Sequence, residues 1–393
     1  MKQNQTKTGT MAVWAGETEP FFGGATVPPI VNSVTFAYKN LEEWYDVATG
    51  KKEGHIYSRN SNPTVEVLEE KIRALENAEA ATAFATGMAA ISNTLFALLS
   101  SGDRVVSIKD TYGGTSKIFL DFLPQYNVDV QLCETTDHEE LEREIHNGCK
   151  VLYLETPTNP TLKVLDLKRL ITAAKKAEAI VVVDNTFATP VNQNPLDLGA
   201  DLVIHSATKF LGGHSDAMGG LVCGKKEHVD TIFQFREING ASLQPMAAYL
   251  LIRGIKTLEL RVQRQNESAL EIARFLQDHS KVKEVFYPGL PTHPGHETAR
   301  EQMSGFGGVL SFSLHGGFET VEQFLPKLKL VHLAASLGSV STLAGPPRTT
   351  SHVEASAEQR KLLGIPESLI RYSVGIENVE DLIDDLERGL ASI

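Results

Sequence analysis

The stretch Leu202-Val203-Ile204-His205-Ser206-Ala207-Thr208-Lys209 predicts a short apolar strand that runs directly into two hydroxyls and a lysine. A second apolar stretch, Val181-Val182-Val183-Asp184, predicts another strand, and this one ends in a carboxylate. In open parallel sheets, ligands bind in the crevice outside the carboxyl ends of the strands. We therefore expect Lys209 and Asp184 to face one site.

Together these residues fit the cofactor pyridoxal phosphate. It needs a lysine to hold its aldehyde as a Schiff base, a carboxylate to keep its ring nitrogen protonated, and phosphate donors such as Ser206 and Thr208. A lone lysine is more often a solvated surface amine, and a lone aspartate after an apolar run is more often a cap or turn residue. Because both hydroxyls lie just upstream of Lys209, the cofactor is the better interpretation.

Composition fits a metabolic enzyme. The 393 residues can bury a large core, and the net charge of -12 argues against a nucleic-acid surface. No apolar run approaches the roughly 20 residues that span a bilayer, and the first ten residues lack a signal core, so we expect a cytoplasmic protein without a membrane partner. The odd and scattered Cys133, Cys149 and Cys223 predict neither disulfides nor a metal site.

The chain divides into three predicted parts. Residues 1–60 are irregular and rich in Gly, Pro and aromatic residues, which predicts an N-terminal arm. In residues 61–255 apolar runs alternate with amphipathic stretches, a pattern typical of βαβ units and a mostly parallel sheet, so this part is the predicted cofactor-binding domain. Residues 256–393 predict a smaller C-terminal α/β domain.

Individual elements follow from hydrophobic spacing. Further strands are expected at 105–108, 128–132 and 151–155, and a half-buried strand at 309–313. Three helices are expected from apolar stripes, namely Val65, Leu68, Ile72 and Leu75; Ile255, Leu258, Val262, Ala269, Ala273 and Leu276; and Val379, Leu382, Leu386 and Leu390.

Other candidate residues belong to the same site. Thr86-Gly87-Met88 opens a predicted helix whose N–H groups could bind a phosphate, although tight packing also favours such a turn. Tyr112 could stack on the cofactor ring, and a rigid bend after Glu155 presents Asn159. Arg371 lies inside an apolar segment and needs an anion, either a substrate carboxylate or a structural Asp or Glu.

With these blocks in view, the chain resembles the cystathionine γ-synthase and γ-lyase family of fold-type I pyridoxal-phosphate enzymes, which includes methionine γ-lyase and O-acylhomoserine sulfhydrylases. The resemblance covers nearly the whole chain, and its blocks stand in the family's order. Besides the residues above, it is carried by Pro28-Pro29-Ile30, Tyr57-Ser58-Arg59, Asn62-Pro63-Thr64, Tyr287-Pro288-Gly289-Leu290 and Ser336-Leu337-Gly338.

The resemblance implies a role for each matching residue. Lys209 would bind the cofactor aldehyde, Asp184 would pair with the pyridine nitrogen, and Tyr112 would stack on the ring and act with them in catalysis. It also implies a homo-oligomer, a dimer of dimers with shared sites. Phosphate contacts would come from Gly87, Met88, Ser206 and Thr208 of one subunit and from Tyr57 and Arg59 of a neighbour, while Asn159, Ser336 and Arg371 would orient the cofactor oxygen and the substrate carboxylate.

Departures from the family pattern bear on the substrate. Members that handle cystathionine usually carry acidic residues where this chain has Ala335 and Ile56, and methionine γ-lyases usually have a cysteine at the position of Gly114. Lys117 lies where relatives place a basic residue near the distal end of the substrate. We expect γ-elimination of a methionine-like or homocysteine-like amino acid to an α-keto acid, ammonia and a thiol.

Several alternatives stay open at this point. They are γ-replacement on an O-activated homoserine, cystathionine γ-lyase or β-lyase activity, and a non-catalytic pyridoxal-phosphate-binding protein. A nicotinamide dehydrogenase is disfavoured because the glycines at 305–308 lead into a strand and lack the third spaced glycine. A serine hydrolase is disfavoured because the stretch 213–217 lacks the closing glycine of a nucleophile elbow.

Overall fold

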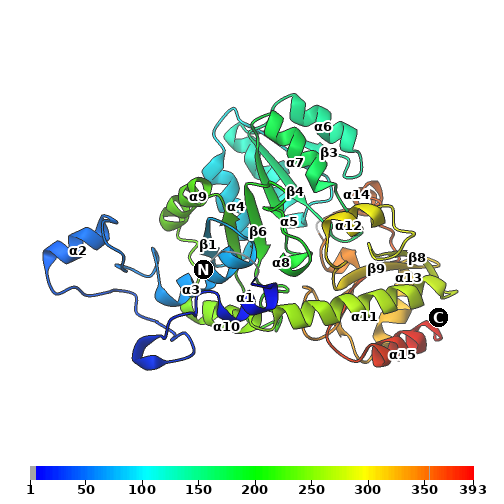
Figure 1. Cartoon of the computed structure of the whole chain (residues 1–393). Helices are drawn as coiled ribbons and strands as arrows, with labels where there is room; N and C mark the ends of the chain where they lie inside the picture. Colours follow the sequence, from blue (N-terminus) through cyan, green and yellow to red (C-terminus); the bar gives the residue numbers. More distant parts are fainter. Residues whose placement is uncertain (1–5, 354) are drawn as a thin grey trace.

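The computed structural model describes residues 6–353 and 355–393, and two β-sheets organise them. The long helix α11 (Leu258–Asp278) crosses the lower half of the view in Figure 1. It contacts α1 (Thr8–Trp14) and α8 (Thr189–Asn192) as well as the second sheet. Within the described residues, no helix is both long and apolar enough to cross a membrane.

The larger sheet has seven strands in the order β1-β7-β6-β5-β4-β2-β3. Strands β2 to β6 pair in parallel, while β7 runs antiparallel to both of its neighbours. The strands are β1 (Ala80–Phe84), β2 (Arg104–Ile108), β3 (Asp129–Cys133), β4 (Val151–Glu155), β5 (Ile180–Asp184), β6 (Leu202–Ser206) and β7 (Gly220–Gly224).

Helices cover both faces of this sheet, which explains why its central strands are apolar along their whole length. Alternate residues of each strand point to opposite faces. Val181 and Val183 of β5 pack on the face of α6 (His138–His146) and α7 (Leu167–Lys176), whereas Val182 packs on the face of α4 (Gly87–Leu98). The remaining helices of this part are α3 (Pro63–Leu75), α5 (Gly113–Lys117), α9 (Lys226–Asn239) and α10 (Pro245–Ile255).

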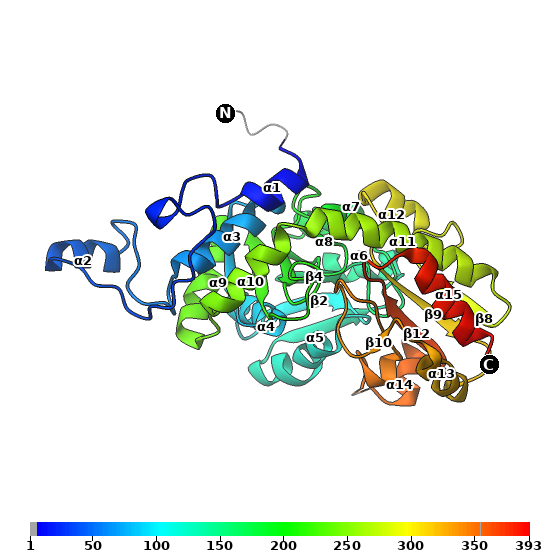
Figure 2. The same ribbon diagram turned by 90° about the horizontal axis from the view of Figure 1, so that it is seen from below.

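The smaller sheet lies beside the first and has the order β10-β11-β12-β9-β8. Helix α15 (Val379–Leu390) shares a hydrophobic cluster with α11 and with β9 and β12. Figure 2 shows this layer at one end of the molecule. Its other elements are β8 (Val282–Phe286), α12 (His296–Gln302), β9 (Val309–Leu314), α13 (Phe318–Phe324), β10 (His332–Leu333), β11 (Leu343–Gly345), α14 (Ala357–Leu362) and β12 (Leu369–Ser373).

Most predicted elements are confirmed within a residue, and three expectations are wrong in detail. The apolar stripe 255–276 belongs to two helices, because the Gly254 carbonyl accepts hydrogen bonds from the side chains of Thr257 and Arg261 where one helix would have continued. Strand β9 is fully buried rather than half-buried, since Ser311 of its second face donates to the carbonyl of Pro160.

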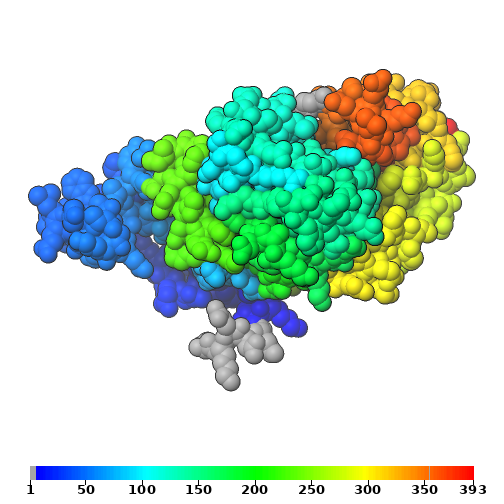
Figure 3. Space-filling model, turned by 90° about the horizontal axis from the view of Figure 1, so that it is seen from above, coloured from blue at the N-terminus to red at the C-terminus, as the bar shows by residue number. Residues whose placement is uncertain are grey.

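The third correction concerns the arm, which is not wholly irregular. It contains α1 and α2 (Leu41–Ala48), and α1 is anchored by Lys71, which is fully buried and donates to the carbonyls of Ala12, Val13 and Ala15. Helix α2 instead projects well away from the body, as Figures 1 and 3 show. Large apolar side chains are exposed along this arm, including Phe22, Leu41 and Tyr45.

Candidate active site

The carboxyl ends of β4, β5 and β6 border a cavity of about 420 Å³, and it holds both Lys209 and Asp184. The expectation that these two residues face one site is therefore confirmed. Ten of the thirteen residues predicted to bind cofactor or substrate line this cavity, namely Gly87, Met88, Tyr112, Asn159, Asp184, Ser206, Thr208, Lys209, Ser336 and Arg371.

Lys209 follows the short turn after β6, and its amine lies inside the cavity. Nζ donates a hydrogen bond to Oγ of Ser336 at 2.9 Å. Burial lowers the pKa of Lys209 to about 8, and the positive charge of Arg371 adds to the effect. An amine with this pKa is substantially unprotonated near neutrality, so it can act as a nucleophile or as a base.

Arg371 comes from β12 of the smaller sheet and is almost wholly buried. Its guanidinium donates to Oδ1 of Asn159 at 3.0 Å and to the carbonyl of Ser336 at 2.8 Å. Among the described residues, no carboxylate lies within ion-pair distance of it. The structural ion pair that the sequence left open is thus absent there, and a buried cation without a counterion is suited to bind a carboxylate from outside.

Ser336 connects the two cations, because its hydroxyl accepts from Lys209 and its carbonyl accepts from Arg371. Its backbone has a φ of 88°, which lies in the left-handed region that non-glycine residues rarely adopt. Such conformations are found where the surrounding structure holds a functional segment in place.

Asp184 ends β5 on the same face as Val182 and is 7% exposed. Oδ1 accepts from the backbone N–H of Thr186 at 3.0 Å, and Oδ2 lies 3.4 Å from the hydroxyl of Tyr153. Burial raises the pKa of Asp184, and these donors counteract part of the rise. In the described part of the chain no cationic side chain pairs with it, so this carboxylate is suited to receive a cationic partner.

An anion cradle lies at the N-terminus of α4. Thr86 caps the helix by bonding the N–H groups of Ala89 and Ala90, and the N–H groups of Gly87 and Met88 precede them at the cavity wall. A Cβ at Gly87 would lie 2.8 Å from Cβ of Ser206, so the close approach of these two segments requires glycine. Helix N-termini with neighbouring hydroxyls bind phosphate groups.

Glu155 also lines the cavity, and sequence reasoning missed it as a site residue. It ends β4 and pairs in register with Asp184. Its Oε2 accepts from the backbone N–H of Tyr112 at 2.8 Å. The sequence shows only that residues 151, 153 and 155 alternate on one face of a strand. The register that sets Glu155 beside Asp184 is known only from the structure.

Three predicted residues lie outside this cavity. Tyr57 and Arg59 contact each other, with the Arg59 guanidinium 5.7 Å from the Tyr57 ring centre, and both belong to the exposed arm. Lys117 lies 3.7 Å from Asp121 and lines a neighbouring cavity of about 400 Å³. The structure of this chain therefore does not bring these three side chains to Lys209.

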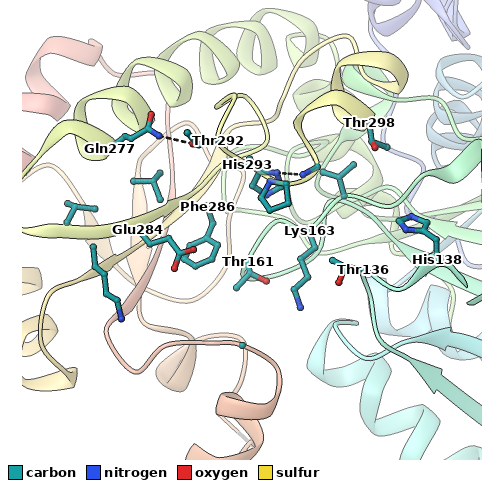
Figure 4. A pocket seen from close by; sticks show the side chains of 17 residues that line it. Thr136, His138, Thr161, Lys163, Gln277, Glu284, Phe286, Thr292, His293 and Thr298 are labelled. Carbon is teal, nitrogen blue, oxygen red and sulfur yellow. Dashed lines mark hydrogen bonds between the residues drawn. The ribbon is translucent and has the colours of Figure 1, made fainter. Parts of the chain in front are cut away.

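A larger cavity of about 670 Å³ lies between the two sheets (Figure 4). Thr161 and Lys163, which follow Asn159 in the chain, line it together with His293 of the smaller part. Burial lowers the pKa of His293 to about 4, so this imidazole is neutral. The cavity contains neither Lys209 nor Asp184, and its size does not make it the reactive site.

None of the described cysteines lines the cavity that holds Lys209. Cys133, Cys149 and Cys223 are free, and burial raises the pKa of each thiol. Over residues 6–353 and 355–393, no cluster of three or more His, Cys, Asp or Glu side chains could hold a metal ion. His205 is buried against Glu76, with Nε2 at 2.6 Å from its carboxylate.

The functional groups that line the cavity fit a particular cofactor together with a particular kind of substrate. A deprotonatable amine, a buried carboxylate without a counterion and an anion cradle suit a phosphorylated pyridine aldehyde, and the free guanidinium suits an amino-acid carboxylate. The fold and the cavity thus define the class of an enzyme that joins a pyridoxal-type cofactor to an amino acid.

Comparison with known proteins agrees with this class. The chain belongs to the family described as Cys/Met metabolism PLP-dependent enzymes, whose profile matches residues 9–391. It is therefore a pyridoxal-phosphate enzyme of sulfur amino-acid metabolism with a fold-type I architecture, as the sequence predicted.

Relatives in this family carry several activities. The chain is 43% identical over 396 residues to an L-methionine γ-lyase of Fusobacterium nucleatum subsp. polymorphum, with all of both proteins covered. It is 43% identical over 372 residues to a cystathionine γ-lyase of Bacillus subtilis, covering 94% of this chain and 98% of that protein. A solved cystathionine γ-synthase from Xanthomonas oryzae pv. oryzae, in complex with cystathionine, superposes with a TM-score of 0.94 at 39% identity, covering 99% of both chains.

Proposed function

We propose that this enzyme catalyses γ-elimination of a methionine-like or homocysteine-like L-amino acid, giving an α-keto acid, ammonia and a thiol. The observation that carries the proposal is the unpaired guanidinium of Arg371 beside the amine of Lys209. It offers a carboxylate site within the same cavity as the residue that would act on the α-carbon.

The cofactor would be held by the residues of this cavity. Lys209 would bind its aldehyde and Asp184 would pair with its ring nitrogen, since each lacks a partner of that kind among the described side chains. The phosphate would bind at the cradle formed by Gly87, Met88, Ser206 and Thr208. When bound, the cofactor supplies an electron sink that stabilises negative charge on the α-carbon of the amino acid.

Substrate binding and proton transfer would then be carried out by side chains of the cavity. Arg371, with Asn159 and Ser336 fixing its orientation, would hold the substrate carboxylate. Once the substrate amine has taken its place on the aldehyde, the freed Lys209 amine, whose pKa of about 8 is near neutrality, would remove the proton from the α-carbon. Tyr112 lines the same cavity and would move a proton as the γ-substituent leaves.

The lining of the cavity favours a small uncharged leaving group. Within the described lining, the acidic side chains are Asp184 and Glu155, and both lie at the strand ends. Position 335, where relatives that handle cystathionine usually carry an acid, is alanine and lines the cavity. The distal ammonium of cystathionine would therefore lack a carboxylate partner from this chain, whereas Met218 and Leu337 suit a methylthio group.

A substrate panel tests the proposal. Purified enzyme is incubated with methionine, homocysteine, cystathionine, cysteine or O-acetylhomoserine, with and without an added thiol, and the products are identified. We expect more keto acid from methionine or homocysteine than from cystathionine. More keto acid from cystathionine, or a thioether product from O-acetylhomoserine at a rate above every elimination, would contradict the proposed activity.

We also propose a homo-oligomer, a dimer of dimers, in which the arm of one subunit completes the site of another. Residues 1–60 would form this arm, with 61–255 the cofactor-binding domain and 256–393 the C-terminal domain. Tyr57 is 41% exposed, and the arm around it presents Phe22 and Leu41 to solvent, which favours an apolar contact with another copy. Such an enzyme, with its free thiols, would suit the reducing cytoplasm.

Mixing two inactive variants tests the shared site. Lys209→Ala and Arg59→Ala homo-oligomers are dissociated together and allowed to reassociate. If sites are shared, some mixed dimers contain one site with both native residues, and activity returns. Activity that stays at the level of the separate variants would mean that Arg59 serves its own subunit or none.

A further inference from the structure

Glu155 is a buried acid that the proposed chemistry leaves without a role. It is 4% exposed and pairs in register with Asp184 on the neighbouring parallel strand. Paired residues of parallel strands point to the same face, so the two carboxyl groups lie side by side on the α4 face of the sheet. Two carboxyl groups that are close and desolvated do not both ionise readily, so one proton tends to remain on the pair.

The surroundings decide which acid keeps this proton. Asp184 accepts from the N–H of Thr186 and from the hydroxyl of Tyr153, and both donors favour its ionised form. A cationic ring nitrogen would favour that form further. Burial, the charge of Asp184 and that of Asp110 raise the pKa of Glu155 far above its ordinary value, and the N–H groups of Tyr112 and Asn159 only partly oppose this.

The carboxyl group of Glu155 also connects two functional turns. Its Oε2 accepts from the backbone N–H of Tyr112, the residue that opens α5 and lines the cavity. A protonated carboxyl group retains a carbonyl oxygen that accepts this bond. Glu155 ends β4, and the chain then continues into the bend that presents Asn159. The Glu155 side chain therefore links this bend to the turn at Tyr112.

We propose that Glu155 is a positioning residue that stays protonated in the holoenzyme, where its neutral carboxyl group holds the Tyr112 turn in place and leaves Asp184 as the single anion of the pair. This inference rests on the proposed cofactor site but not on the proposed substrate. Any amino acid that the holoenzyme turns over serves in its kinetic test, and the decisive measurement needs no substrate.

Comparing Glu155→Gln with Glu155→Ala separates the effect of an uncharged side chain from the effect of losing the hydrogen bond with the Tyr112 N–H. Glutamine is uncharged and keeps the oxygen that accepts from Tyr112, so we expect kcat within about threefold of the native value. Alanine removes the acceptor of the Tyr112 N–H and so releases the turn, and we expect kcat to fall at least about tenfold. Glu134→Gln, just past the end of β3 with 45% of its side chain exposed, is the matched control and should change nothing.

Infrared spectroscopy of the holoenzyme at neutral pH reports the proton directly. Burial raises the pKa of Glu66 to about 7, so other acids absorb in the same region and difference spectra are needed to cancel them. We expect the native-minus-Glu155→Gln difference spectrum to contain the C=O stretching band of a protonated carboxyl group, and the native-minus-Glu134→Gln difference spectrum to lack it. A structural role alone would not produce this band. The inference is overturned if the band is absent from the native-minus-Glu155→Gln difference spectrum, or if glutamine lowers kcat as much as alanine. If Glu155→Ala fails to fold, the infrared band and the kcat of Glu155→Gln still test the inference.

Discussion

Replacing Lys209 with methionine should stabilise the cofactor-free protein near neutral pH. The folded-state pKa of Lys209 falls from the ordinary 10.5 to about 8, and each pKa unit corresponds to about 1.4 kcal/mol. The protonated amine thus destabilises the folded state by about 3 kcal/mol at pH 7, where both folded and unfolded chains bind the proton. Methionine has a similar length and no charge, so it removes this penalty.

The sign of the pH dependence follows from the direction of the shift. Between pH 8 and 10.5 the unfolded chain binds more protons at this position than the folded chain, so the native protein gains stability as pH rises. The advantage of Lys209→Met should therefore shrink from about 3 kcal/mol at pH 7 to about 1.5 kcal/mol at pH 9.5. Loss of the bond to Ser336 will reduce both values.

Urea unfolding of the cofactor-free proteins at the two pH values measures the effect. Lys176→Met, an exposed lysine in α7, is the matched control and should change the free energy of unfolding by less than about 0.5 kcal/mol at either pH. The reasoning is refuted if Lys209→Met is no more stable than the native protein at pH 7, or if its advantage is equal at both pH values.

Three further substitutions test separate parts of the site. Gly87→Ala places a Cβ 2.8 Å from Cβ of Ser206, so cofactor affinity should fall at least about tenfold in a titration followed by absorbance, and unchanged affinity would exclude the cradle. Arg371→Lys cannot keep both hydrogen bonds and bind a carboxylate bidentately, so KM should rise at least about tenfold while kcat changes less, and an unchanged KM would place the carboxylate elsewhere. Ala335→Glu supplies the missing acid, so the kcat/KM ratio of cystathionine to methionine should rise at least about tenfold, and a constant ratio would remove position 335 from substrate choice.

The central strands and two of the helices could be predicted because their hydrophobic patterns are short-range in sequence and recur from one element to the next. Strands β4, β5 and β6 are mainly apolar, and each ends in a polar residue that faces the cavity. Hydrophobic pattern and strand direction together therefore located Lys209 and Asp184. The stripes of α3 and α15 were equally clear, because their apolar residues recur at helical spacing and are buried in the structure.

Features that depend on contacts distant in sequence could not be predicted in this way. The break after Ile255 is produced by side chains that bond the carbonyl of Gly254, and the chain there has neither proline nor an obvious stop signal. Strand β7 was missed because the glycines that bound it, at 220 and 224, normally indicate turns. Glu155 was missed because its importance arises from its register with Asp184.

The most direct test of the account concerns the residue that carries the cofactor. Borohydride reduction of the holoenzyme converts the bond between lysine and pyridoxal phosphate into a stable amine, and mass spectrometry of the digested protein then locates the label. The account predicts the label on the peptide that contains Lys209 and no label in Lys209→Ala. A label on another lysine of the native enzyme, or none at all, would contradict it.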